Sequence, residues 1–217
     1  KYMTQVYLIR HGETEWNAER RIQGQSNSPL TELGELQARQ VAARLSQMGI
    51  THVIASDLGR TRQTGQAIAD ACGCELILDS RLRELHMGVL EERLLDSLSP
   101  EEEKWRKQMV DGTPDARIPE GESMAELATR MRAALNSCLD LPEGSQPALV
   151  SHGIALGALL GTILGLPPHA ERRLRLRNCS LSRVDYQQSP WLAPGWVVES
   201  AGDIHHLDRP ALDEIQR

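Results

Sequence analysis

The chain has 217 residues, with 24 lysines and arginines against 30 aspartates and glutamates, which gives a formal net charge of −6. This acidic balance disfavours generic nucleic-acid binding, and four tryptophans, three tyrosines and no phenylalanine leave few rings on which bases could stack. The apolar runs fall short of the ~18 residues that a membrane span needs, and no basic-then-apolar leader opens the sequence. We therefore expect one cytoplasmic domain over residues 1–217, with no membrane or nucleic-acid partner.

Apolar runs rich in branched side chains alternate with longer segments of helical period. This pattern is typical of a mainly parallel sheet covered by helices. The sequence therefore predicts an α/β fold built as a three-layer sandwich, with a mostly parallel central sheet flanked by helices. The expected strands are residues 5–9, 53–55, 76–78, 148–150, 181–186 and 196–199, and the expected helices begin near residues 31, 59, 99, 123 and 153, the first of them ending at about residue 48.

Residues 91–122 interrupt the alternation of strands and helices. Within them, Ser99 and Glu102 have the spacing of a capping box, and Pro100 stands at the first helical position. A short, strongly charged helix is expected to follow. We expect the whole stretch to form an insertion over one edge of the fold, placed where it could act as a lid.

A dense run of positive charge, RRLRLR, occupies residues 172–177. Its alternation predicts a strand with Arg173, Arg175 and Arg177 on one face. That face would meet either water or a second copy of the chain in a homodimer. The four cysteines lack the ligand spacing of a zinc site, so no metal is expected.

Four reactive side chains follow four of the expected strands. His11 comes after the first, Arg60 after the second, Glu84 after the third and His152 after the fourth. The carboxyl ends of parallel strands share one edge of a sheet, where the crevice between helices is the usual ligand site. Although these residues are far apart in the sequence, we expect them to meet in space.

The arginines near these strand ends predict a phosphate site. Arg10, Arg60 and Arg62 offer planar cationic forks that fit phosphate oxygens, although Arg62 fits a solvated helix surface equally well. The helix that begins at residue 59 would also direct free backbone N–H groups towards an anion. A phosphorylated small molecule is therefore the expected ligand.

The remaining residues at this edge suggest group transfer. Positive neighbours disfavour protonation of His11, so its imidazole would keep a lone pair and act as a nucleophile on phosphorus. Glu84 could protonate the leaving oxygen, unless it pairs with Arg81 or Arg83. His152 could stabilise the equatorial oxygens during transfer. The reaction needs neither a metal nor another cofactor.

Several motifs resemble those of one known family. Residues 10–17 (RHGETEWN) are similar to the amino-terminal signature of the histidine phosphatase superfamily, in particular its cofactor-dependent phosphoglycerate mutase-like branch. The other matching motifs, in the order expected for the family, are Gln23-Gly24, residues 29–34 (PLTELG), residues 56–64 (SDLGRTRQT), residues 82–84 (LRE) and residues 151–153 (SHG). Together they cover residues 6 to about 165, and the resemblance implies a phosphoglycerate mutase-like fold.

The resemblance also implies roles for individual residues. His11 would become phosphorylated, Arg10, Arg60 and His152 would hold the phosphoryl group, and Glu84 would serve as acid and base. The substrate pocket would be lined by Asn17, Gln23, Gly24, Arg62, Arg106, Lys107, Gly153 and Ile154.

The family contains phosphatases and mutases, and two positions favour a phosphatase. Met87 stands before Gly88 where the mutases usually carry tyrosine, and Ile154 stands where they carry asparagine. A phosphatase that acts on small phosphorylated metabolites, such as three-carbon acids, is the preferred hypothesis. The alternative is a phosphoglycerate mutase primed by 2,3-bisphosphoglycerate, which interconverts 2- and 3-phosphoglycerate in glycolysis.

Two further classes of protein fit the sequence less well. A phosphate-binding module without turnover has no need for a proton donor such as Glu84. A metallophosphatase needs clustered carboxylate and histidine ligands at this edge, which the sequence does not suggest.

Overall fold

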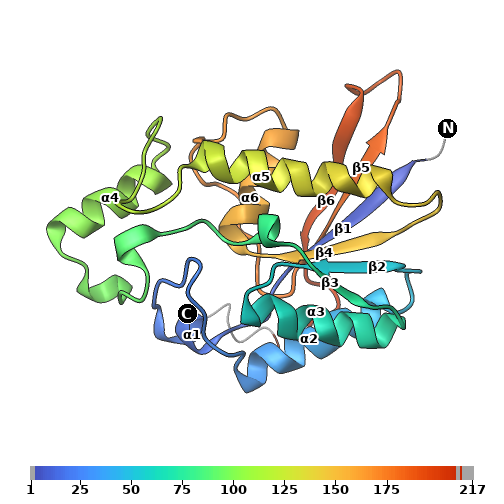
Figure 1. Cartoon of the computed structure of the whole chain (residues 1–217), viewed down its shortest axis with the longest axis horizontal. Helices are drawn as coiled ribbons and strands as arrows, with labels where there is room; N and C mark the ends of the chain where they lie inside the picture. Colours follow the sequence, from blue (N-terminus) through green and yellow to red (C-terminus); the bar gives the residue numbers. More distant parts are fainter. Residues whose placement is uncertain (1–2, 209–210, 212–217) are drawn as a thin grey trace.

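The computed structural model describes residues 3–208 and 211. Its centre is a six-stranded sheet with the strand order β3-β2-β4-β1-β5-β6 (Figure 1). The pairs β1–β4, β4–β2 and β2–β3 are parallel, whereas β5 and β6 join in antiparallel pairs. The strands are β1 (Thr4–Arg10), β2 (His52–Ala55), β3 (Leu76–Leu78), β4 (Pro147–Ser151), β5 (Leu181–Gln187) and β6 (Gly195–Asp203).

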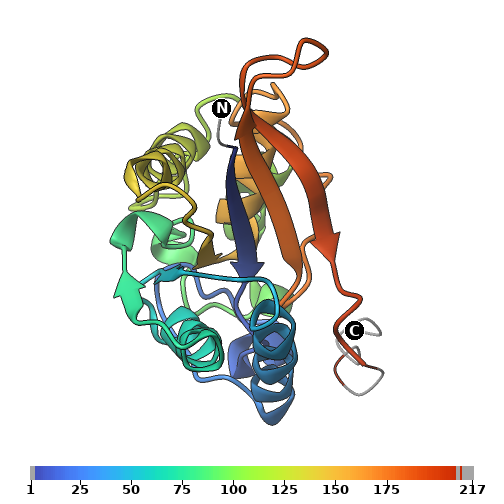
Figure 2. The ribbon, with the colours of Figure 1, turned by 90° about the vertical axis from the view of Figure 1, so that its right-hand side faces the viewer.

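Helices cover both faces of the sheet, so the predicted three-layer α/β architecture is confirmed. Figure 2 shows the layers from the side. Along β1, Val6 and Leu8 pack into one apolar layer with α5 (Met124–Ser137) and α6 (Gly153–Ile163). Tyr7 and Ile9 pack into the other layer with α2 (Glu32–Leu45) and α3 (Gly59–Cys72). This alternation is what a strand with both faces buried requires.

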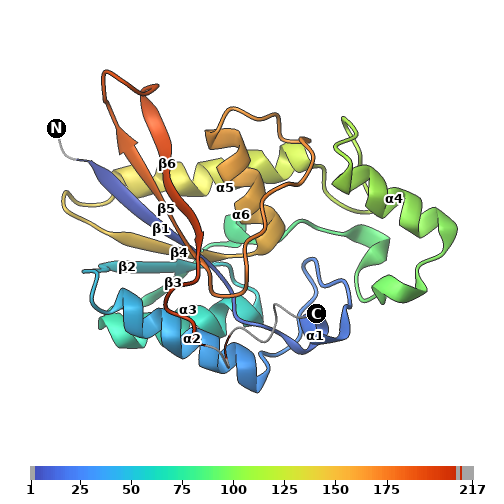
Figure 3. The same ribbon diagram turned by 180° about the vertical axis from the view of Figure 1, so that it is seen from behind.

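The insertion at residues 91–122 contains the 3₁₀ turn η3 (Leu95–Ser97) and the helix α4 (Pro100–Val110). The predicted capping box is confirmed: the Ser99 hydroxyl accepts from the Glu102 N–H, and the Glu102 carboxylate accepts from the Ser99 N–H. In Figures 1 and 3, α4 lies beyond the end of the sheet, at the end where the short helix α1 (Glu15–Glu19) also lies. The remaining 3₁₀ turns are η1 (Ser80–Leu82), η2 (Gly88–Leu90) and η4 (Cys138–Asp140).

Two local predictions were wrong, and one short helix was not predicted. Residues 172–177 do not form a strand, and the Leu176 carbonyl accepts a hydrogen bond from the Arg10 side chain instead of a neighbouring strand. The helix α1 was not expected, because its five residues carry no apolar period; a capping box between Thr14 and Asn17 starts it. The helix expected to reach residue 48 ends at Leu45, followed by turns.

The turn after β1 depends on close contact between two backbones. A Cβ atom on Gly12 would stand 2.5 Å from the carbonyl oxygen of Gly34, at the start of α2. The Gly12 N–H donates to the Thr64 hydroxyl on α3 at 3.0 Å. Glycine at this position therefore lets the chain after His11 pack tightly between α2 and α3.

Within residues 3–208, no helix is long and apolar enough to cross a membrane.

Candidate active site

One pocket of about 610 Å³ lies at the carboxyl ends of the parallel strands. Arg10, His11, Arg60 and Glu84 line it together, as the order of the strands predicts. His152 does not line the pocket; it is fully buried behind His11, with the two ring centroids 5.2 Å apart. Residues from four separate parts of the sequence are therefore gathered at one place.

His11 is buried, with 3% of its surface exposed. Its Nδ1 lies 2.7 Å from the carbonyl oxygen of Gly12, which can only accept, so Nδ1 carries the proton and Nε2 keeps a lone pair. Burial lowers the pKa of His11 well below 6.5, and the positive charges of Arg60 and Arg10 lower it further. At neutral pH the imidazole is therefore uncharged and nucleophilic.

His152 is held by a polar contact with Ser56. Its Nε2 lies 2.9 Å from the Ser56 hydroxyl, which follows β2. Burial lowers the pKa of His152 well below 6.5, and the charge of Arg60 contributes to the same shift. Its Nδ1 is buried and has no hydrogen-bond partner among residues 3–208 and 211. A buried nitrogen in this condition has capacity for a ligand atom.

These lowered pKa values predict how the protein responds to acid. We expect the NMR signals of His11 and His152 to titrate well below pH 6.5. The unfolded chain binds these protons near pH 6.5 and the folded chain does not, so the free energy of unfolding should fall as the pH drops below 6.5. A midpoint for His11 at or above pH 6.5 would contradict a neutral nucleophile. Comparison with the spectrum of His11→Ala assigns the signal.

Backbone carbonyls hold the guanidinium group of Arg60. Its two terminal nitrogens donate to the carbonyls of Gly24 at 2.6 Å and Ser26 at 2.7 Å. Burial lowers the pKa of Arg60 to about 10, so the group remains charged at neutral pH. Its Nε is buried without a partner in the described part of the chain. Arg60 thus carries a positive charge and an unused donor.

Glu84 lies at the N-terminus of α6. Its Oε2 accepts from the N–H of Ile154 at 3.0 Å, and its Oε1 accepts from the N–H of Ala155 at 2.9 Å and of Leu85 at 2.8 Å. These contacts fix the orientation of the carboxyl group. The side chain cannot pair with Arg81 or Arg83 as well, because those arginines bind Asp79 and Asp57.

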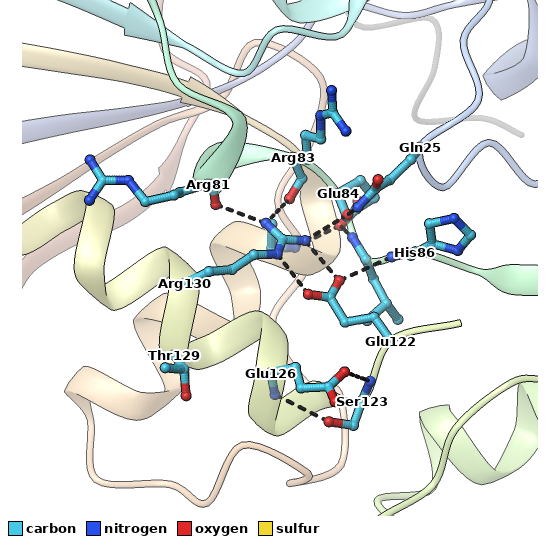
Figure 4. A network of polar contacts seen from close by, with 12 residues as sticks. Gln25, Arg81, Arg83, Glu84, His86, Glu122, Ser123, Glu126, Thr129 and Arg130 are labelled. Atoms are coloured by element: carbon cyan, nitrogen blue, oxygen red, sulfur yellow. Dashed lines mark hydrogen bonds and ion pairs between the residues drawn. The ribbon is translucent and has the colours of Figure 1, made fainter. Parts of the chain in front are cut away.

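Arg130, on α5, fixes the backbone that carries Glu84 (Figure 4). Its guanidinium donates to the carbonyls of Arg81, Arg83 and Glu84 at 2.6–2.8 Å, and it forms two hydrogen bonds with the carboxylate of Glu122. This side chain therefore joins the segment after η1 to α5.

The structure brings six of the eight expected substrate-pocket residues to the pocket. They are Asn17, Gln23, Gly24, Arg106, Gly153 and Ile154. Arg62 and Lys107, which were also expected there, are not among the residues that line the pocket. Arg62 is exposed two residues beyond Arg60 on α3, a spacing that directs it away from the pocket. Lys107 follows Arg106 on α4, points about 100° away from it and pairs with Asp111 at 2.6 Å.

Sequence reasoning missed several residues that line the pocket. Four are arginines: Arg21, Arg172, Arg173 and Arg175. The last three belong to the charged run at residues 172–177, so the signal was visible but was assigned to a strand face. The insertion contributes Leu95, Met109 and Val110 in addition to Arg106.

Comparison with known proteins shows the family of the chain. Residues 6–199 match the histidine phosphatase superfamily (branch 1). The chain belongs to this family. Probable phosphoglycerate mutase GpmB of Serratia proteamaculans is 77% identical over 215 residues, which cover 99% of this chain and 100% of that protein. The resemblance inferred from the motifs is therefore confirmed, and the protein is an enzyme of the histidine phosphatase superfamily.

Solved structures of this family share the fold. Bacillus stearothermophilus YhfR has a TM-score of 0.85 and 28% identity, over 94% of this chain and 98% of that one. A mycobacterial glucosyl-3-phosphoglycerate phosphatase has a TM-score of 0.78 and 26% identity, over 92% and 99% of the two chains. The family fold thus extends over almost the whole chain.

Proposed function

We propose that the protein hydrolyses phosphomonoesters of small metabolites through a phosphohistidine at His11. The observation that carries this proposal is the neutral imidazole of His11 in one pocket with the guanidinium groups of Arg10 and Arg60 and the carboxyl group of Glu84. The arginines attract and orient the phosphate dianion, and His11 supplies the nucleophile. Nε of Arg60, which lines the pocket, is an unused buried donor that a phosphate oxygen would satisfy.

The reaction proceeds in two displacements. In the first, Nε2 of His11 forms a bond to phosphorus as the bond to the ester oxygen breaks, and protonated Glu84 gives its proton to that oxygen. In the second, the Glu84 carboxylate takes a proton from a water molecule, whose oxygen attacks phosphorus. The bond to Nε2 breaks, inorganic phosphate leaves, and Glu84 is again protonated. Each step thus begins with the protonation state that the previous one leaves.

Two apolar side chains support hydrolysis over isomerisation. Met87 and Ile154 line the pocket at positions where the mutases of the family carry polar residues. A mutase must retain a bisphosphorylated intermediate and exclude water from phosphohistidine, whereas a phosphatase only has to admit water.

Phosphoglycerate mutase activity remains the second candidate, because close relatives carry the name probable phosphoglycerate mutase. One comparison separates the two: incubation with 3-phosphoglycerate, with and without 2,3-bisphosphoglycerate as primer. A phosphatase releases inorganic phosphate in both mixtures and forms no 2-phosphoglycerate in either. Formation of 2-phosphoglycerate that depends on primer and exceeds phosphate release would show a mutase instead.

Arg130 offers a test of how Glu84 is positioned. Replacing Arg130 with methionine removes its bonds to three carbonyls, so we expect kcat for alkyl phosphates to fall by about 10- to 100-fold, with KM little changed. The rate with nitrophenyl phosphate, whose leaving group needs no proton, should fall much less. Steady-state kinetics with both substrates on the folded variant measures the difference.

Arg117→Met is the matched control, because Arg117 pairs with Glu126 on the exposed surface. It should keep nearly the wild-type rates. Equal losses with both substrates in Arg130→Met would mean that the side chain supports the fold in general and not the position of the acid.

A further inference from the structure

The lining of the pocket is strongly cationic, although the protein as a whole carries a net charge of −6. Among the described residues that line the pocket, Glu84 is the one acidic residue, and seven residues are arginines. They are Arg10, Arg21, Arg60, Arg106, Arg172, Arg173 and Arg175. Binding one phosphoryl group accounts for Arg10 and Arg60 in the proposed function, and five positive charges are left.

Three of these five charges are neutralised within the protein. Arg21 pairs with Glu19, Arg106 with Glu103 and Arg173 with Glu171. For the side chains of Arg172 and Arg175, no ion pair or hydrogen bond occurs with any residue of the described ranges 3–208 and 211. These two guanidinium groups are therefore available to a ligand.

Arg172 lies within electrostatic range of the reactive residues. Its charge interacts with those of Glu84 and Arg10, and the protein atoms around its side chain lower the pKa of its guanidinium, although the residue is exposed. The segment that carries it is anchored to the end of α4. The Arg172 N–H donates to the carbonyl of Val110 at 3.4 Å, and a Cβ on Gly112 would stand 2.9 Å from the Glu171 nitrogen. Arg172 is thus fixed at the side of the pocket formed by the insertion.

The pocket is larger than a phosphoryl group with a short alcohol requires. Its volume of about 610 Å³ falls within the range of sites that hold drug-sized ligands, roughly 300–1,000 Å³. Met87, Met109 and Leu174 give part of the wall an apolar surface. Such a wall favours a ligand with an apolar portion as well as its charged groups.

We propose that Arg172 binds a second oxyanion of the substrate. The preferred substrate is then a phosphomonoester whose alcohol portion carries an apolar spacer and, at its far end, a carboxylate or a second phosphoryl group. A guanidinium fork suits either oxyanion. This inference rests on the proposed function, since it takes the phosphate ester to be bound at Arg10, Arg60 and His11.

A different role for Arg172 predicts different behaviour. If its charge served only to balance Glu84, its loss would alter the reaction of every phosphate ester equally. If it binds a second oxyanion, its loss weakens only those ligands that carry one. Measurements of binding without turnover separate the two roles and do not depend on hydrolysis.

The test uses alkylphosphonates, which are not hydrolysed, in a series of increasing chain length. Each is made with a terminal carboxylate, a terminal phosphonate and a terminal carboxamide, and Kd is measured by calorimetry on the wild type and on Arg172→Ala. At the best chain length, we expect the wild type to bind one of the two charged forms about 10- to 100-fold more tightly than the carboxamide. Arg172→Ala should bind all three alike, and Arg172→Lys should retain part of the preference.

Arg39→Ala, an exposed arginine on α2, is the matched control and should keep the preference. If Arg172→Ala is unstable, Arg172→Gln replaces it. Three results would each overturn the inference. They are equal binding of the charged and neutral forms by the wild type, a preference that survives the loss of Arg172, and no binding of any phosphonate. Failure of the proposed function is recognised separately, as the absence of phosphate release from phosphomonoesters.

Discussion

Replacing His11 with alanine should lower kcat for phosphomonoesters by on the order of 10⁴-fold or more, because the reaction then has no nucleophile. The structure gives His11 the features of a nucleophile. His11 is buried, its Nδ1 proton is bound to the carbonyl of Gly12, and its Nε2 is kept neutral by burial and by two arginines. No second imidazole replaces it, since His152 lies behind it and binds Ser56.

The loss should concern the chemical step and not the binding of phosphate. Inorganic phosphate or vanadate should still bind to His11→Ala, because Arg10 and Arg60 remain. His205→Ala, a change of an exposed histidine after β6, serves as the control and should keep full activity. Residual activity of His11→Ala within tenfold of the wild type would show that another group attacks phosphorus.

Replacing Glu84 with glutamine is expected to lower kcat for alkyl phosphates by about 10²- to 10⁴-fold, the range typical of a lost general acid. The change keeps the size of the side chain but removes its proton. With nitrophenyl phosphate the first step needs no acid, so the phosphoenzyme should form at nearly the wild-type rate. Its hydrolysis should then be slow, because no base activates the water.

Rapid-mixing kinetics with nitrophenyl phosphate measures both parts of this prediction. Glu84→Gln should release a burst of nitrophenol equal to the amount of enzyme, followed by a slow steady phase. Glu92→Gln, a change of an exposed glutamate in the insertion, is the control. A uniform loss with all substrates, without a burst, would mean that Glu84 mainly holds the start of α6 through its bonds to Ile154 and Ala155.

The central sheet and the reactive residues could be predicted because both depend on local signals. Strands of branched apolar residues, each followed by a charged residue or histidine, indicate a parallel sheet with chemistry at one edge, and the motif around His11 is specific. The same reasoning located Glu84, even though its role depends on the backbone N–H groups of α6, which lies 70 residues further along the chain.

The rest of the pocket could not be predicted, because it depends on contacts between distant segments. The charged run at residues 172–177 alternates like a strand. Its backbone instead bonds to distant groups: the Leu176 carbonyl accepts from the Arg10 side chain, and the Arg172 N–H donates to the Val110 carbonyl at the end of α4. On α4, both Arg106 and Lys107 are basic, and only the rotation of the helix decides that Arg106 faces the pocket. The sequence therefore predicted the residues gathered at the strand ends better than the other residues that line the pocket.

The most direct test of this account is detection of the phosphoenzyme. The protein is mixed with a ³²P-labelled phosphomonoester, quenched within the first turnovers and analysed for bound phosphate. We expect a phosphate group on His11 that is labile in acid and stable in alkali, located by mass spectrometry and absent from His11→Ala. Phosphate released at full rate with no label on His11, or label on another residue, would contradict it.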